Sequence, residues 1–96
     1  MSLSDIVRME ATVMGMVQGV YFRQYTLQEA RRLNLVGWVA NQPDGAVRVV
    51  AEGNIEALNQ FLEYLHNGSP ASHVRDVAVN WTAAGDEFTD FRVRYL

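Results

Sequence analysis

Residues 7–33 read VRMEATVMGMVQGVYFRQYTLQEARRL, and this stretch decides the fold because its hydrophobic period changes once. From Val7 to Val13 apolar and polar residues alternate, a period of two that predicts a half-buried strand. After two glycines, mostly apolar side chains recur at helical spacing, at Phe22, Thr26, Ala30 and Leu33. The stretch therefore predicts a strand, a glycine-containing loop and a helix in direct succession.

A hairpin is predicted to follow this first helix. Asn34 is suited to the left-handed conformation that ends a helix. Residues 35–41 and 46–53 are rich in β-branched and aromatic side chains, and they are separated by the tight-turn sequence Gln42-Pro43-Asp44-Gly45. We therefore expect two adjacent antiparallel strands joined by this turn.

The second half of the chain predicts one more helix and two more strands. Asn54 can cap a helix with a clean apolar stripe, and Asn67-Gly68 ends it. Residues 77–81 alternate again, and a last short alternation covers residues 91–95. The order β-α-β-β-α-β with a short C-terminal strand indicates an α+β, ferredoxin-like sandwich, in which two helices cover one face of an antiparallel sheet.

This topology brings two distant segments to one edge of the sheet. The first two strands are expected to run parallel through a right-handed helical crossover, with the third strand antiparallel between them. The loop after the first strand and the end of the second strand then lie roughly 10 Å apart at the backbone. Side chains from the two segments can therefore share one ligand.

Composition indicates a single domain over residues 1–96, with residues 1–5 expected to be poorly ordered. Because 49% of the 96 residues are hydrophobic, a packed core is expected. The sequence contains no cysteine, which excludes disulfides and thiolate sites and suits a reducing compartment. The formal net charge of −3 argues against general binding to nucleic acid or to membranes. We expect a monomer in the cytoplasm.

The loop from Gly15 to Phe22 is the first candidate site. Its glycines permit conformations in which successive N–H groups point into one concavity, and the start of a helix adds further free N–H groups. Arg23 falls in the first helical turn, where the helix dipole disfavours a cation by up to about 1 kcal/mol. A phosphoryl group would offset that cost through paired hydrogen bonds, whereas the alternative is a surface arginine paired with a carboxylate.

Asn41 is the second candidate. It ends the strand over residues 35–41, where a polar residue can simply open the following turn. Because the topology brings Asn41 near the glycine loop, its neutral amide can also hold a water molecule by donating and accepting hydrogen bonds. That is a positioning role and not proton abstraction.

Two sequence motifs and the end of the chain resemble one protein family. The first signature of the acylphosphatase family is similar to Gly15-Met16-Val17-Gln18-Gly19-Val20-Tyr21-Phe22-Arg23. Its second signature resembles Gly37-Trp38-Val39-Ala40-Asn41, followed by Gly45, Val47 and Gly53. The ending Phe91-Arg92-Val93-Arg94-Tyr95 is similar as well, so the likeness covers nearly the whole chain.

The resemblance implies an activity and a role for each motif. It implies hydrolysis of the carboxyl-phosphate anhydride of small acyl phosphates, with no metal and no other cofactor. It also implies that Arg23 and the amides of residues 15–22 bind the phosphoryl group, or inorganic phosphate or sulfate as ligands, and that Asn41 orients the attacking water. Met16 and Ala40 stand where many relatives carry a basic residue, which implies weaker electrostatic attraction for the substrate.

The available side chains suit this chemistry. Phosphoryl transfer through a loose transition state depends on positioning and charge stabilisation. The leaving carboxylate has a conjugate-acid pKa of roughly 4 to 5, so that no general acid is required. The absence of an evident histidine or paired-carboxylate arrangement in the sequence is therefore compatible with an activated anhydride as substrate.

The remaining polar and aromatic residues have structural interpretations. His66 and His73 lack cysteines or carboxylates at ligand spacing and are predicted to have surface or capping roles. Trp38 and Trp81 are predicted to pack in the core or on a sheet face. A solvated face is predicted for three glutamates, Glu52, Glu56 and Glu63.

Two other functions are compatible with the same fold. One is a noncatalytic module that binds a phosphorylated metabolite or a partner protein. The other is an RNA-binding domain, which the acidic charge and the missing basic-aromatic strand motif disfavour.

Overall fold

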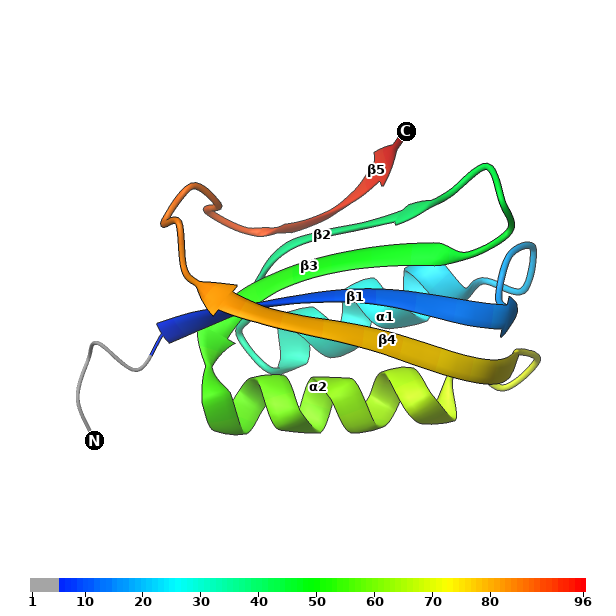
Figure 1. Cartoon of the computed structure of the whole chain (residues 1–96), viewed down its shortest axis with the longest axis horizontal. Coiled ribbons are helices and arrows are strands. Elements are labelled where there is room, and N and C mark those ends of the chain that lie inside the picture. Colours follow the sequence, from blue (N-terminus) through cyan, green and yellow to red (C-terminus); the bar gives the residue numbers. More distant parts are fainter. Residues whose placement is uncertain (1–5) are drawn as a thin grey trace.

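A computed structural model describes residues 6–96 of the chain (Figure 1). The expectation for residues 1–5 lies outside the described residues. The elements follow in the order β1 (Ile6–Met16), α1 (Phe22–Arg32), β2 (Val36–Asn41), β3 (Val47–Asn54), α2 (Ile55–Asn67), β4 (His73–Ala83) and β5 (Phe91–Tyr95). Each predicted helix and strand is present. Strands β1 and β4 are longer than predicted because they pair with each other along almost their whole length.

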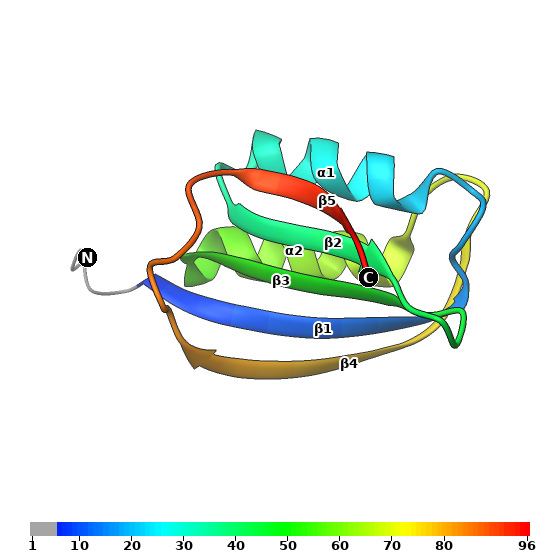
Figure 2. The same cartoon turned by 90° about the horizontal axis from the view of Figure 1, so that it is seen from above.

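The strands form one sheet in the order β4-β1-β3-β2-β5. Strand β3 pairs antiparallel with both β1 and β2, so β1 and β2 run parallel to each other with β3 between them. Strand β5 adds to β2 in parallel, and β4 adds to β1 in antiparallel orientation. Both helices cover the same face of the sheet (Figure 2). The ferredoxin-like prediction is therefore confirmed.

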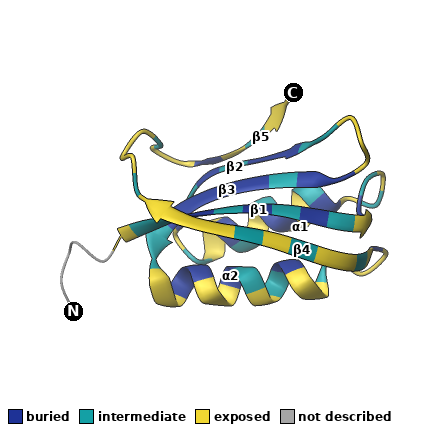
Figure 3. Cartoon of the chain, viewed as in Figure 1, coloured by how far each residue is buried: buried dark blue, intermediate teal, exposed yellow. Residues whose placement is uncertain are grey.

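The core lies between the sheet and the helices. Helix α1 packs against β2 and β5, while α2 packs against β1, β3 and β4. The buried stripes contain Phe22, Thr26 and Ala30 on α1, and Ala57, Leu58, Phe61 and Leu65 on α2. Figure 3 shows that the outer sides of α2 are exposed while the central strands are largely buried. Burying each large apolar side chain contributes about 1.5–3 kcal/mol, so this interface supplies most of the stabilisation.

The helix ends follow the predicted sequence signals. The Oδ1 atom of Asn54 accepts a hydrogen bond of 2.8 Å from the N–H of Ala57, so the predicted cap is confirmed. Asn34 adopts a left-handed conformation with φ of 58°, as predicted for the end of the first helix. Gly68 ends α2 with φ of 77°, and its N–H donates to the carbonyl oxygen of Tyr64 at 2.7 Å.

The prediction that Glu52 is solvated is wrong, since its side chain is only 3% exposed. It accepts hydrogen bonds from Arg8 Nε at 2.7 Å and from the N–H groups of Gly85 and Asp86 at 3.0 and 3.3 Å. Burial has the largest single effect and raises the pKa of Glu52. The hydrogen bonds and the charge of Arg8 together outweigh burial, so the pKa of Glu52 lies below its ordinary value. The segment between β4 and β5 thus covers the Glu52 carboxylate, although the polar character of Glu52 in the sequence predicts an exposed position.

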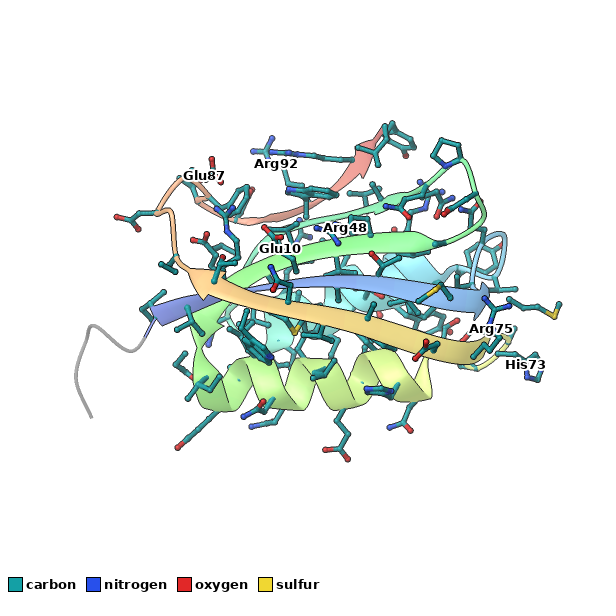
Figure 4. All side chains as sticks on the ribbon, viewed as in Figure 1. Glu10, Arg48, His73, Arg75, Glu87 and Arg92 are labelled. Atoms are coloured by element: carbon teal, nitrogen blue, oxygen red, sulfur yellow. The ribbon has the colours of Figure 1, made fainter. Side chains whose placement is uncertain are left out.

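Other charged and aromatic side chains lie on the face of the sheet that the helices leave open. Figure 4 shows Arg48 of β3 beside Glu10 of β1, where Arg48 Nη2 donates to Glu10 Oε1 at 3.3 Å. Trp38 packs on this face beneath Arg94, whose Cζ atom lies 5.2 Å from a ring centroid of the indole. Sheet-face packing of Trp38 is therefore confirmed.

Several peripheral predictions concern exposed positions. Surface locations are confirmed for Glu56, Glu63, His66 and His73. Trp81 lies on the edge strand β4 and remains 40% exposed, so only part of its ring contributes to packing. Neither helix of residues 6–96 has the length and apolarity that crossing a membrane requires.

Candidate active site

A cavity of about 600 Å³ lies where the N-terminus of α1 meets the ends of β2 and β5. Its walls combine apolar, aromatic and polar side chains with backbone of the loop between β1 and α1. The lining residues are Val17, Gly19, Tyr21, Phe22, Arg23, Gln24, Asn41, Val93 and Tyr95. The two residues predicted to carry the chemistry, Arg23 and Asn41, therefore share one cavity although 18 positions separate them in the sequence.

Arg23 is the second residue of α1 and the charged group of this cavity. The first turn of α1 contains no acidic residue. No carboxylate in residues 6–96 lies within ion-pair distance of the Arg23 guanidinium. Instead, Arg23 Cζ lies 5.4 Å from the centroid of the Tyr95 ring. The predicted alternative, a surface arginine paired with a carboxylate, is therefore not what the described part of the chain shows, and the guanidinium can receive an anion.

Asn41 ends β2 and contributes a neutral amide side chain to the lining of the same cavity. Its Oδ1 atom is buried, and no donor in the described chain reaches it. A buried amide oxygen without a donor is destabilising by roughly 1–3 kcal/mol unless water or a ligand satisfies it. The amide has both donors and an acceptor, so it can hold and orient a water molecule.

The loop between β1 and α1 has backbone features that favour anion binding. Gly19 has φ of 74° and Tyr21 has φ of 60°, so two residues of a short segment are left-handed. The N–H groups of Val17 to Tyr21 donate to no backbone or side-chain acceptor within the described range. Left-handed residues of this kind orient successive N–H groups into a concavity that attracts anions, and the start of α1 adds its partial positive charge.

Four predicted phosphate-binding residues lie outside the cavity lining: Gly15, Met16, Gln18 and Val20. Gly15 and Met16 belong to the end of β1, beyond a bulge in its pairing with β4, and Met16 is 66% exposed. A Cβ atom on Gly15 would collide with the carbonyl oxygen of His73, so glycine is needed there for close approach of β4. Phosphate binding stays a prediction for all of residues 15–23, these four included.

Sequence reasoning missed three lining residues, Gln24, Val93 and Tyr95. The parallel pairing of β5 with β2 places Tyr95 opposite Asn41 in the ladder. The alternation of Phe91, Val93 and Tyr95 indicated that these side chains share a face. What the sequence did not indicate was which strand β5 would join. Residues 6–96 hold no group of three or more His, Cys, Asp or Glu side chains placed for a metal ion.

Comparison with known proteins places this chain in a family. A family model described as acylphosphatase matches residues 9–93. The acylphosphatase of Salinibacter ruber is 47% identical over 87 residues, which make up 91% of this chain and 92% of that protein. The chain belongs to the acylphosphatase family. As a member of the acylphosphatase family it is an enzyme, a hydrolase of acyl phosphates, which favours catalysis over the two noncatalytic alternatives.

Solved acylphosphatases have the same architecture. The crystal structure of acylphosphatase from Bacillus subtilis matches 93% of this chain and 99% of that chain, with a TM-score of 0.90 and 39% identity. The acylphosphatase from Coxiella burnetii matches with a TM-score of 0.85 and 36% identity, over 98% of this chain and 100% of that chain. The fold and the family thus agree over nearly the full length.

Proposed function

We propose that this acylphosphatase cleaves the carboxyl-phosphate anhydride of small acyl phosphates by in-line attack of a water molecule that Asn41 positions. Arg23 and the amides of residues 15–22 hold the phosphoryl group. One observation carries the proposal: within residues 6–96, the guanidinium of Arg23 has no carboxylate partner, the buried amide oxygen of Asn41 has no donor, and both residues line the same cavity. A phosphoryl group can pair with the guanidinium, and a water molecule in the cavity can pair with the Asn41 amide.

Binding of the phosphoryl group uses charge and geometry together. The Arg23 guanidinium can donate two parallel hydrogen bonds to phosphoryl oxygens, and the N–H groups from Val17 to Tyr21 can donate to the others. In a loose transition state, negative charge spreads over these oxygens. Donors that are already oriented stabilise that charge without reorganisation, which is the larger part of catalysis in such a site.

The bond changes need no general acid. Water attacks phosphorus, and the bond between phosphorus and the carboxyl oxygen breaks with its electron pair on the departing carboxylate. Both protons of the water end on the inorganic phosphate, as dihydrogen phosphate. Asn41 cannot accept a proton under ordinary conditions, so its role is to orient the water opposite the leaving oxygen.

The proposal also concerns the ligands and cofactors of the site. Inorganic phosphate, the product, and sulfate, its tetrahedral analogue, are proposed to bind the same loop. No metal or other cofactor has a part in the proposed reaction. The monomeric state and the cytoplasmic location stay predictions from the composition of the chain.

The test is hydrolysis of benzoyl phosphate in the presence of a chelator. For Arg23→Ala we expect kcat/KM to fall by about 10²–10³-fold and inhibition by inorganic phosphate to be lost, because the charged donor is removed. For Asn41→Ala we expect kcat to fall by about 10²-fold with phosphate inhibition retained, because only the water loses its partner.

Matched controls separate these roles from general damage. Arg75→Ala on β4 and Asn59→Ala on α2 remove the same side-chain types at exposed positions and are expected to leave kcat and KM unchanged. Near wild-type turnover by either site variant would contradict the assigned role of that residue.

A further inference from the structure

We infer that Gln18 is a positioning residue that fixes the phosphate loop to the turn directly after Asn41, so that the bound phosphoryl group and the attacking water stay aligned. The inference rests on the proposed function. Gln18 Nε2 donates to the carbonyl oxygens of Gln42 and Ala46, each at 2.8 Å. An amide nitrogen has two hydrogens, so these two bonds use its full donor capacity.

The two acceptors are the two ends of the β2–β3 turn. Gln42 follows Asn41 directly, and Ala46 precedes Val47, the ladder partner of Asn41. Within the turn, the N–H of Gln42 donates to the carbonyl oxygen of Ala46 at 2.8 Å. The Gln18 amide therefore binds both residues that lie next to the last pair of that ladder on the turn side, and it acts on the backbone that carries Asn41.

Strand pairing does not make this connection. Strand β1 pairs with β3 only as far as Val13 opposite Val47, and beyond that point it pairs only with β4, to Met16 opposite His73. After Val13, β1 therefore has no backbone pairing with the β2–β3 hairpin that carries Asn41, and the phosphate loop follows β1. The side chain of Gln18 bridges the gap that the ladder leaves, and Figure 1 shows the loop and the turn at the same end of the sheet.

A second contact holds the loop on its other side. The hydroxyl group of Ser69, which is 3% exposed, donates to the carbonyl oxygen of Val20 at 3.2 Å. Gly19 lies between these two attachments and has a left-handed backbone. The Ser69 contact leads to the segment between α2 and β4, however. Among the side-chain hydrogen bonds of residues 6–96, those of Gln18 are the ones that join the loop to the turn after Asn41.

The consequence is specific to the chemical step. The proposed phosphate donors, the loop N–H groups and Arg23, all belong to residues 15–23. Asn41 comes from β2, so the distance between water and phosphorus depends on how the two segments are joined. A displacement of about 1 Å in such an arrangement can lower the rate by 10²-fold. Loss of the Gln18 contacts is therefore expected to lower kcat while phosphate binding persists.

The test compares Gln18→Met and Gln18→Glu with the wild-type enzyme, using benzoyl phosphate as substrate and inorganic phosphate as inhibitor. Methionine keeps the length of the side chain without donors, and glutamate places acceptors against two carbonyl oxygens. We expect kcat to fall by about 10-fold to 100-fold in Gln18→Met and further in Gln18→Glu. The inhibition constant for inorganic phosphate is expected to stay within about twofold, which also shows that the loop is folded. Gln28→Met, an exposed position on α1, is the matched control and is expected to leave kcat unchanged.

Two outcomes would overturn the inference. A wild-type kcat in Gln18→Met would show that the contacts do not align the reaction. Parallel losses of kcat and phosphate affinity would show that Gln18 shapes or damages the anion site itself. Failure of the proposed function is distinguishable from these outcomes. In that case Arg23→Ala or Asn41→Ala would retain turnover of benzoyl phosphate, irrespective of the result for the Gln18 variants.

Discussion

The guanidinium of Arg23 lies over the ring of Tyr95, with 5.4 Å between Arg23 Cζ and the ring centroid. The two residues are 72 positions apart in the sequence, and they meet because β5 joins β2 in parallel. Tyr95 is 85% exposed, so burial does not explain its position. The ring instead lines the cavity and offers the guanidinium a cation–π contact.

We expect Tyr95→Ala to weaken binding in this cavity, while Tyr95→Phe keeps it. A cation–π contact at an exposed site contributes about 0.5–1 kcal/mol, which corresponds to a twofold to fivefold rise in KM and in the inhibition constant for inorganic phosphate. Steady-state kinetics with benzoyl phosphate measure both constants. Equal constants for Tyr95→Ala and Tyr95→Phe would show that the ring does not act on Arg23.

Gly15 and Gly19 belong to the same motif but are expected to differ in their contribution to stability. A Cβ atom on Gly19 would meet no atom within 4 Å. Gly19→Ala is therefore expected to lower the free energy of unfolding only because of the left-handed backbone, by about 1–2 kcal/mol. A Cβ atom on Gly15 would also collide with the backbone of β4, so Gly15→Ala is expected to lower the free energy of unfolding by roughly 2–4 kcal/mol. Urea unfolding measures both losses, and equal losses would contradict the packing role of Gly15.

Glu52 is expected to make the stability of the protein depend on acid pH. Its pKa is lowered in the folded state, so its contribution is fully present above the ordinary glutamate pKa of about 4.3 and is lost as the pH falls through the lowered value. We expect Glu52→Gln to reduce the free energy of unfolding by about 2 kcal/mol at pH 7, and this difference to shrink in acid.

Urea unfolding of the wild type and Glu52→Gln between pH 7 and pH 3 measures that difference. Glu63→Gln is the matched control, because Glu63 is exposed on α2 and its removal is expected to leave the pH dependence unchanged. A constant difference between wild type and Glu52→Gln over this range would show that the carboxylate gains no stabilisation from Arg8 and the two backbone N–H groups.

Local sequence determined the elements and their order. The change from alternation to helical spacing after Val13, the Gln42–Gly45 turn and the Asn54 cap each act within a few residues, so they could be predicted without knowing the rest of the fold. The loop-to-helix motif and the strand ending at Asn41 then followed, because short connections leave few ways to pair the strands. For that reason the cavity containing Arg23 and Asn41 could be predicted from the sequence.

Only the tertiary structure decided which side chains surround these residues. Tyr95 reaches Arg23 because β5 joins β2, Gln18 reaches the turn after Asn41 because β1 leaves β3, and Glu52 is buried because a distant segment covers it. Each of these contacts joins residues at least 24 positions apart. Alternation and helical spacing report which side of an element faces inward, but they carry no information on which distant backbone group or ring arrives there.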